Sequence, residues 1–127
     1  MPTPERHLEY AERNALLARR LLKAAPEWAT VLAFYSALHH VERYASKERD
    51  GCFGHKERAT YIGETGELWP IQVDYALLRT LSERVRYECP PMTNELYDVA
   101  HVEAEVFPLL SHVKDHIDYL MNLTQTG

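Results

Sequence analysis

The strongest constraint on the fold of this 127-residue chain is that its apolar residues recur at steps of three and four along four separate segments. This spacing places them on one face of an α-helix, and no segment shows the strict alternation that is typical of a half-buried strand. Four amphipathic helices bury their apolar stripes most simply against one another. We therefore expect an all-α protein, an antiparallel four-helix (up-down) bundle in which residues 1–127 form a single domain.

Capping residues and proline predict the bounds of the first two helices. Thr3 can accept hydrogen bonds from free backbone N–H groups, and Pro4 suits the first position of a helix that runs to about Ala25. The second helix carries apolar residues on more than one side, so we expect it to be the most buried helix. It should end near Asp50-Gly51, because glycine readily adopts the left-handed conformation that closes a helix.

The connection over residues 51–70 carries four of the five glycines. A short extra helix is expected within it, from His55 to Ile62. Connections longer than about 12 to 15 residues in a compact domain are usually functional or mobile, so this segment is a place to look for function.

Prolines also predict the bounds of the remaining helices. The third helix should open at Pro70 and end at Cys89-Pro90-Pro91, because proline lacks the N–H that a helix needs. Thr93 or Asn94 should cap the last helix, which keeps a heptad-like rhythm to about Leu120, and Pro108 should bend it.

Charge and composition narrow the classes of function. The net charge of −5 opposes an extended phosphate-binding face, so any nucleic-acid contact would be local. The start of the chain lacks the apolar run of about 7 to 15 residues of an export signal, and no run approaches the ~20 residues of a membrane span. We therefore expect a cytoplasmic protein without a membrane partner. Cys52 and Cys89 lie far apart, and we expect reduced thiols.

Two glutamates occupy positions where the helical rhythm calls for apolar residues, Glu42 and Glu103. We favour the interpretation that each lies at a helix edge and reaches water, because glutamate is rarely fully buried. If either is buried it needs a partner, and the candidates are His39, Arg84 and Arg86.

One face of the third helix carries Tyr75, Arg79, Ser82 and Arg86, which follow one another at steps of four, three and four. Arg86 lies beside Tyr87 at the end of this helix. Its guanidinium is suited to bind a phosphate or a carboxylate with two hydrogen bonds, and equally suited to hold the last carbonyls of its own helix.

Histidines form two further groups. His39-His40 lies in the most buried helix, and one of the two, turned inward with Tyr35, would be titratable in a dry environment. A core histidine with a hydrogen-bond partner is the favoured interpretation. His101, His112 and His116 fall roughly on one side of the last helix, and His112 and His116 have the i, i+4 spacing that zinc ligands use. No third ligand is evident, so we favour a solvated polar face and expect no metal or other cofactor.

Several short motifs occur in one order along the chain. They are Trp28, Phe34-Tyr35-Ser36-Ala37-Leu38-His39, His55-x-x-Arg58 and Tyr75-x-x-Leu78-x-x-x-Ser82-x-x-x-Arg86-Tyr87. Together they resemble HEPN-domain proteins over residues 28–87. The resemblance implies a helical bundle that commonly dimerises, in a family of RNA-cleaving toxins, antiviral and CRISPR-associated ribonucleases and partners of small nucleotidyltransferases. Many members of that family are non-catalytic.

The ribonuclease signature of this family is an arginine followed a few residues later by a histidine. Arg86 stands where that arginine is expected, but no histidine follows it, and the formal match of Arg49 with His55 spans a glycine-containing loop. The resemblance therefore implies a dimeric binding or accessory module, without catalysis, in a nucleic-acid-related or toxin–antitoxin defence system. Its expected partners are a second copy, an RNA or nucleotide, and a nucleotidyltransferase-type protein. Its ligand-binding residues would be Tyr35, His39, His55, Arg58, Ser82, Arg86 and Tyr87.

Two alternatives remain open. The first is a divergent metal-independent endoribonuclease in which Arg86 acts with His39 or His55 as acid or base. The second is a metal-binding bundle served by the histidines of the last helix.

Overall fold

The computed structural model describes residues 2–52, 54–91 and 93–126, with the side chains of 124–126 left out of the description. The elements in chain order are α1 (Pro4–Leu21), α2 (Pro26–Glu48), α3 (Gly54–Glu64), η1 (Gly66–Ile71), α4 (Gln72–Glu83), η2 (Arg84–Glu88), η3 (Glu95–Tyr97), α5 (Val99–His101), η4 (Val102–Val106) and α6 (Phe107–Thr126). All are helices, and the described residues contain no strand, so the expected all-α class is confirmed. No helix within these ranges has the length and apolar character to cross a membrane.

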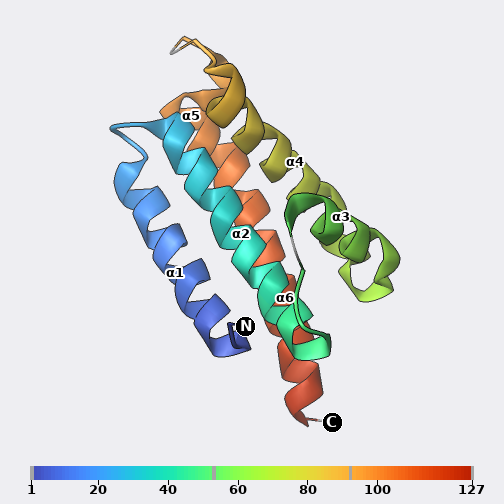
Figure 1. Cartoon of the computed structure of the whole chain (residues 1–127). Helices are drawn as coiled ribbons and strands as arrows, with labels where there is room; N and C mark the ends of the chain where they lie inside the picture. Colours follow the sequence, from blue (N-terminus) through green and yellow to red (C-terminus); the bar gives the residue numbers. More distant parts are fainter. Residues whose placement is uncertain (1, 53, 92, 127) are drawn as a thin grey trace.

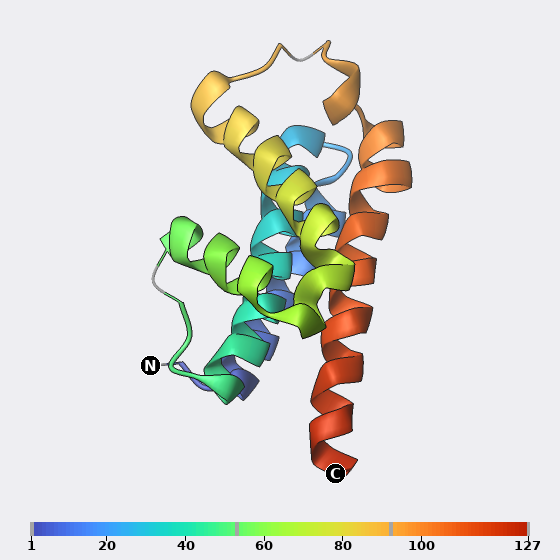
Figure 2. The same ribbon diagram turned by 90° about the vertical axis from the view of Figure 1, so that its right-hand side faces the viewer.

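Helix α2 lies at the centre of the molecule. It packs against α1 on one side and against α4 and α6 on the other, while α3 lies beside α4 (Figures 1 and 2). Phe34, Ala37 and Val41 of α2 are completely buried, and α2 has more buried residues than any other described helix. The expectation that this helix is the most buried is therefore confirmed.

Small side chains bring α1 close to α2. Ala11 and Ala18 on α1 are completely buried, as is Ala33 on α2. The buried Ser36 hydroxyl donates a 2.7 Å hydrogen bond to the Ala11 carbonyl. Because alanine allows the two backbones to approach, this side-chain hydrogen bond can fix the register of one helix on the other.

The first two helices end earlier than the sequence predicts. Helix α1 ends at Leu21 rather than near Ala25, because the residue before Pro26 is pushed out of the helical region, and Ala25 has a φ of −153°. Helix α2 ends at Glu48, and Gly51 then adopts the expected left-handed conformation with a φ of +85°. The extra helix predicted from His55 to Ile62 is present as α3.

The start of the third helix was predicted two residues too early. Pro70 belongs to the 3₁₀ helix η1, whose Leu68 and Ile71 are fully buried, and α4 starts only at Gln72. This 3₁₀ helix turns the chain into the core before the α-helical hydrogen bonding begins. Beyond α4, the π-helical turn η2 ends at Glu88, and Cys89, with a φ of +46°, follows it ahead of the predicted pair of prolines.

The last helix is capped by a different residue from the two predicted. Asn94 caps the short helix η3, whereas the Asp98 carboxylate accepts a 2.7 Å hydrogen bond from the backbone N–H of His101 and so starts α5. The helix passes through a π-helical turn, η4, immediately before the residues that contain Pro108. Pro108 has no N–H to donate within the helix. A π-helical turn changes the hydrogen-bond pattern of the preceding residues, so the helix can continue past the proline.

Two neighbouring leucines of α4 provide a test of the core. Leu78 is completely buried, whereas Leu77 is 48% exposed. We predict that Leu78→Ala lowers the free energy of unfolding by about 2–5 kcal/mol, because it removes apolar contacts and leaves a cavity. The same substitution at Leu77 should cost less than about 1 kcal/mol. Urea denaturation measures both, and equal losses would contradict this packing of α4.

Candidate functional site

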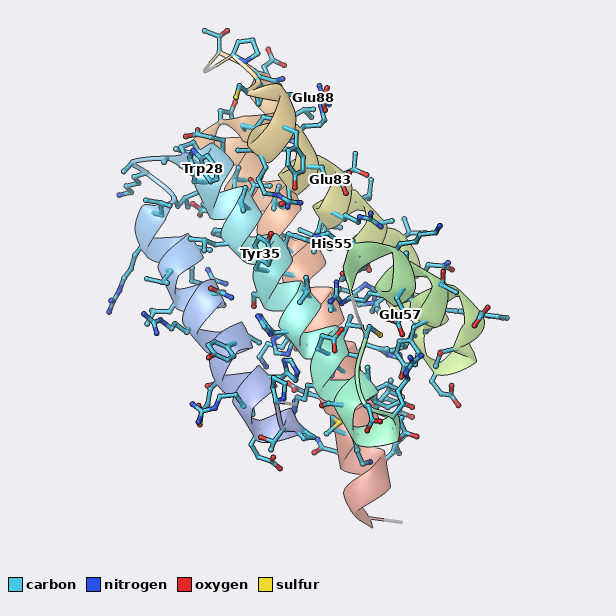
Figure 3. All side chains as sticks on the ribbon, in the orientation of Figure 1. Trp28, Tyr35, His55, Glu57, Glu83 and Glu88 are labelled. Atoms are coloured by element: carbon cyan, nitrogen blue, oxygen red, sulfur yellow. The ribbon has the colours of Figure 1, made fainter. Side chains whose placement is uncertain are left out.

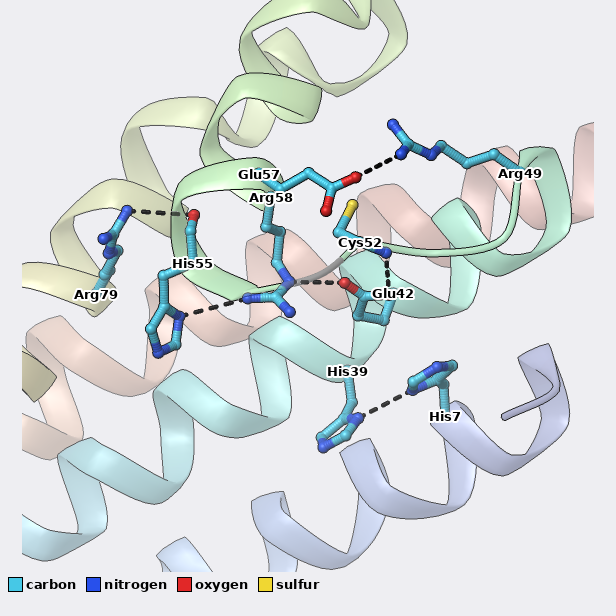
Figure 4. A network of polar contacts seen from close by, with 9 residues as sticks. All are labelled: His7, His39, Glu42, Arg49, Cys52, His55, Glu57, Arg58 and Arg79. Carbon is cyan, nitrogen blue, oxygen red and sulfur yellow. Dashed lines mark hydrogen bonds and ion pairs between the residues drawn. The ribbon is translucent and has the colours of Figure 1, made fainter. Parts of the chain in front are cut away.

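A buried ion pair joins α2 to α3. The Arg58 Nε–H donates to Oε1 of Glu42 at 2.8 Å, and the two side chains are 7% and 6% exposed (Figure 4). The interpretation that Glu42 reaches water is therefore wrong, and its partner is none of the three that the sequence suggested. Glu103, in contrast, is exposed, as expected.

The same carboxylate orders the connection between α2 and α3. Its second oxygen, Oε2, accepts a 3.2 Å hydrogen bond from the backbone N–H of Cys52. Next to Arg58, the pKa of the Cys52 thiol is nevertheless raised to about 11 by burial and by the negative charge of Glu42. Cys52 is therefore a protonated structural thiol at neutral pH rather than a nucleophile.

Arg86 forms the second polar centre, at the end of α4. Its Nε–H donates to the Ser82 hydroxyl at 3.1 Å and to the Ser82 carbonyl at 3.4 Å, so it does hold a carbonyl of its own helix. Its Nη1 donates to the hydroxyl of Tyr35 at 3.1 Å and to that of Tyr87 at 3.3 Å. The sequence motifs therefore meet in space here, since α2 and α4 lie side by side.

Aromatic rings surround this guanidinium. Its central carbon lies 5.0 Å from the ring centroid of Tyr87, 5.5 Å from that of Tyr35 and 5.9 Å from that of Phe34. Nη2 is buried and has no hydrogen-bond partner in the described part of the chain. No carboxylate of the described residues forms an ion pair with Arg86. The guanidinium is thus held by neutral groups alone.

His55 lies next to this centre, on α3. Its ring centroid is 5.7 Å from that of Phe34, the same ring that faces Arg86. Arg58 Nη1 lies 3.4 Å from its Nδ1, and Arg79 Nη1 donates to its backbone carbonyl at 3.5 Å. Burial lowers the pKa of His55, and the positive charges of Arg58, Arg79 and Arg86 lower it further, so the imidazole is neutral at pH 7.

His39 lies away from Arg86 and faces α1. Its Nδ1 is 3.0 Å from Nδ1 of His7 (Figure 4). Its ring also contacts Tyr10, with centroids 5.2 Å apart. One imidazole must donate and the other accept, so the two cannot both be protonated while this hydrogen bond exists. Burial, and then the charges of His7 and Arg58, lower the pKa of His39 to about 4.

The predicted site residues are therefore divided between two places. Tyr35, Ser82, Arg86 and Tyr87 meet at the end of α4, and His55 and Arg58 adjoin them across the Phe34 ring, whereas His39 belongs to the contact between α1 and α2. Figure 3 shows Tyr35 and His55 on the facing sides of α2 and α3.

Phe34 and Arg79 were parts of recognised motifs, but only the structure shows that they link the elements around the site. His7 gave no signal in the sequence.

The histidines of the last helix have partners in other elements. His112 hydrogen-bonds the Asp74 carboxylate, and Nε2 of His116 lies 2.6 Å from the Glu67 carbonyl oxygen. Within residues 2–52, 54–91 and 93–126, no group of three or more histidine, cysteine, aspartate or glutamate side chains is arranged to hold a metal ion. Both contacts fasten α6 to η1 and α4.

Comparisons with known proteins leave the site to be judged on its geometry. No family model matches the chain, and no curated protein or solved structure does so either.

The buried ion pair generates a stability prediction. Arg58→Met should lower the free energy of unfolding by about 3–5 kcal/mol, because it leaves the Glu42 carboxylate buried without its counter-charge. The matched control is Arg49→Met, since Arg49 also reaches α3, through a 2.6 Å ion pair with Glu57 whose side chains are 43% and 33% exposed. Loss of this partly exposed pair should cost about 1 kcal/mol or less.

Chemical denaturation of the two variants measures the difference. A loss in Arg58→Met no larger than that in Arg49→Met would contradict the burial of the Glu42–Arg58 pair.

The lowered pKa values of the buried histidines predict that the protein loses stability in acid. Burial also lowers the pKa of His7, and it lowers the pKa of His40, fully buried in α2, to about 4. The ordinary histidine pKa is 6.5, so the unfolded chain binds more protons as the pH falls from about 6.5 to about 4. The free energy of unfolding should fall over this window, by about 1.4 kcal/mol for each unit of pKa difference.

Urea denaturation between pH 7 and pH 4 measures this slope. His39→Gln should reduce it, because one of the responsible imidazoles no longer titrates. An unchanged slope in this variant would show that the pair does not control acid stability.

Proposed function

We propose that this protein is a HEPN-like binding module, without catalytic activity, that holds an RNA phosphate at Arg86. In this proposal α1, α2, α4 and α6 are the four helices of an antiparallel bundle, and α3 is an addition to it. Assembly as a homodimer, a nucleotidyltransferase-type partner and a place in a defence system rest on the family resemblance, whereas the cytoplasmic location is the expectation drawn from the sequence.

The observation that carries the proposal is the guanidinium of Arg86, partly buried and held by neutral groups. A buried charge without a counter-charge is costly, and hydroxyl and carbonyl oxygens compensate for only part of that cost. Arg58 and Arg79, by comparison, form ion pairs with Glu42 and Glu83. An anion bound at Arg86 would supply the missing negative charge.

A phosphate of a single-stranded RNA suits the surroundings of Arg86. Nη2 has donors that no described residue uses, and guanidinium groups bind phosphate oxygens through two parallel hydrogen bonds. Because Nη2 is buried, the proposal requires the exposed Tyr87 side chain, which bonds Nη1, to move aside and admit the phosphate. Tyr87, which is 73% exposed, offers a ring on which an adjacent base can stack. The net charge of −5 is compatible with a contact of this size, because only one or two phosphates are held.

The surroundings of His55 favour binding over cleavage. Its Nδ1 is turned to Arg58, and burial and then the charges of three arginines lower its pKa, which disfavours the protonated form that a general acid requires. His39 is engaged with His7 on the other side of α2. His55 adjoins the Arg86 centre but is turned to Arg58, whereas His39 faces α1, and this arrangement supports binding over the ribonuclease alternative.

RNA binding to variants of two nearby arginines tests the proposal. A fluorescently labelled oligoribonucleotide should bind the wild-type protein without being cut, and Arg86→Ala should weaken binding at least about tenfold, the effect of one lost charge-assisted hydrogen bond. Arg84→Ala is the matched control, because Arg84 carries the same charge in the same turn but is 41% exposed and lies 4.0 Å from Glu88. It should change binding less than about threefold, as expected for an exposed charge.

Equal weakening by the two substitutions, or no binding by the wild-type protein, would refute the Arg86 site. Cleavage of the RNA that is lost in both Arg86→Ala and His55→Ala would establish the ribonuclease alternative instead. Tyr35→Phe removes only one hydroxyl from Arg86 and serves as a second variant if Arg86→Ala does not fold.

A further inference from the structure

A cleft of about 250 Å³ lies between α3 and α4, separate from the Arg86 centre. Two hydrogen bonds hold α3 in place beside it. Arg79 of α4 donates to the His55 carbonyl, and the indole N–H of Trp69, in η1, donates to the Gly63 carbonyl at 2.9 Å. The short side chains of Ala59 on α3 and Ala76 on α4 leave space between the two helices.

Apolar groups line its walls and polar groups its edge. Ala59 and Ile62 come from α3, and Ala76 and the buried Tyr75 come from α4. The polar lining residues are Gln72, Arg79, Thr80 and Glu83. Pockets for drug-sized ligands usually measure about 300–1,000 Å³, so a cleft of this volume suits a smaller molecule with one apolar part.

The charges at the cleft indicate which polar groups the bound molecule carries. Arg79 Nε donates to Oε1 of Glu83 at 2.8 Å, and the two side chains are 30% and 39% exposed. Figure 3 shows Glu83 close to His55, at the end of the cleft where Arg79 crosses to α3. A partly exposed pair of this kind on one helix stabilises the protein by only a few tenths of a kcal/mol, so both groups remain available to a ligand.

We propose that this cleft binds a free α-amino acid with an uncharged apolar side chain. The α-carboxylate pairs with Arg79, the α-ammonium pairs with Glu83, and the side chain fills the space between Ala59 and Ala76. A zwitterion matches the pair because each of its charges meets the opposite charge on α4. The Gln72 amide and the Thr80 hydroxyl complete the polar edge. This binding is independent of the RNA contact at Arg86.

Thermal denaturation with added amino acids tests the cleft. L-leucine, L-methionine or L-phenylalanine at millimolar concentration should raise the melting temperature, because a ligand that binds only the folded state stabilises it. The amide of the same amino acid, which lacks the carboxylate, and its N-acetyl derivative, which lacks the ammonium, should each bind at least about tenfold more weakly.

Substitutions in α3 complete the test. Ala59→Trp should fill the cleft and remove the effect of the amino acid, whereas Thr60→Trp, at the exposed neighbouring position, should preserve it. If Ala59→Trp does not fold, Ala76→Leu narrows the cleft from the opposite wall. No stabilisation by any of the three amino acids, binding of either derivative as tight as that of the free amino acid, or an unchanged response of the filled variant would overturn the proposal.

Discussion

The ion pair between Glu42 and Arg58 determines how the chain between α2 and α3 is arranged. Two charges within a helical core are stable there only if each satisfies the other and the remaining hydrogen-bonding groups find partners. Here one carboxylate oxygen takes the guanidinium and the other takes the backbone of Cys52. Because Arg58 lies one helical turn after His55, the same pair places His55 against Phe34. The position of α3 therefore depends on this buried carboxylate, together with the contacts that Arg79 and Trp69 make with the α3 backbone.

Phe34 connects the polar groups that this arrangement brings together. Its ring contacts His55 and Tyr75 and lies under the guanidinium of Arg86, so residues of α2, α3 and α4 share one aromatic surface. The ring excludes water from the inner side of Arg86 and offers it no hydrogen-bond acceptor. The hydroxyls of Tyr35, Ser82 and Tyr87 hold the guanidinium at this surface without neutralising it. A held but uncompensated charge is suited to binding an anion rather than to structure alone.

The elements that depend on local chemistry were predictable from the sequence. Helical periodicity gave the all-α class and the most buried helix, and glycine gave the turn at Gly51 with its positive φ. Boundaries shifted where two residues of similar capping ability compete, as Asn94 and Asp98 do. The partner of Glu42 was missed for a physical reason. A helical pattern shows which side chains share a face, but pairing between α2 and the connection depends on how a glycine-rich segment folds back.

The positions of Tyr35 and His39 show the limit of what a helical pattern can predict. Tyr35 and His39 are one turn apart on α2, so periodicity places them together and predicts that both face Arg86. In the structure the small rotation of residues around a helix of 3.6 residues per turn is enough to separate them. Tyr35 reaches α4, whereas His39 reaches His7 on α1. Because α2 is in contact with helices on several sides, side chains that differ by this small angle around its axis meet different helices. Only the packed structure shows which residues can act together.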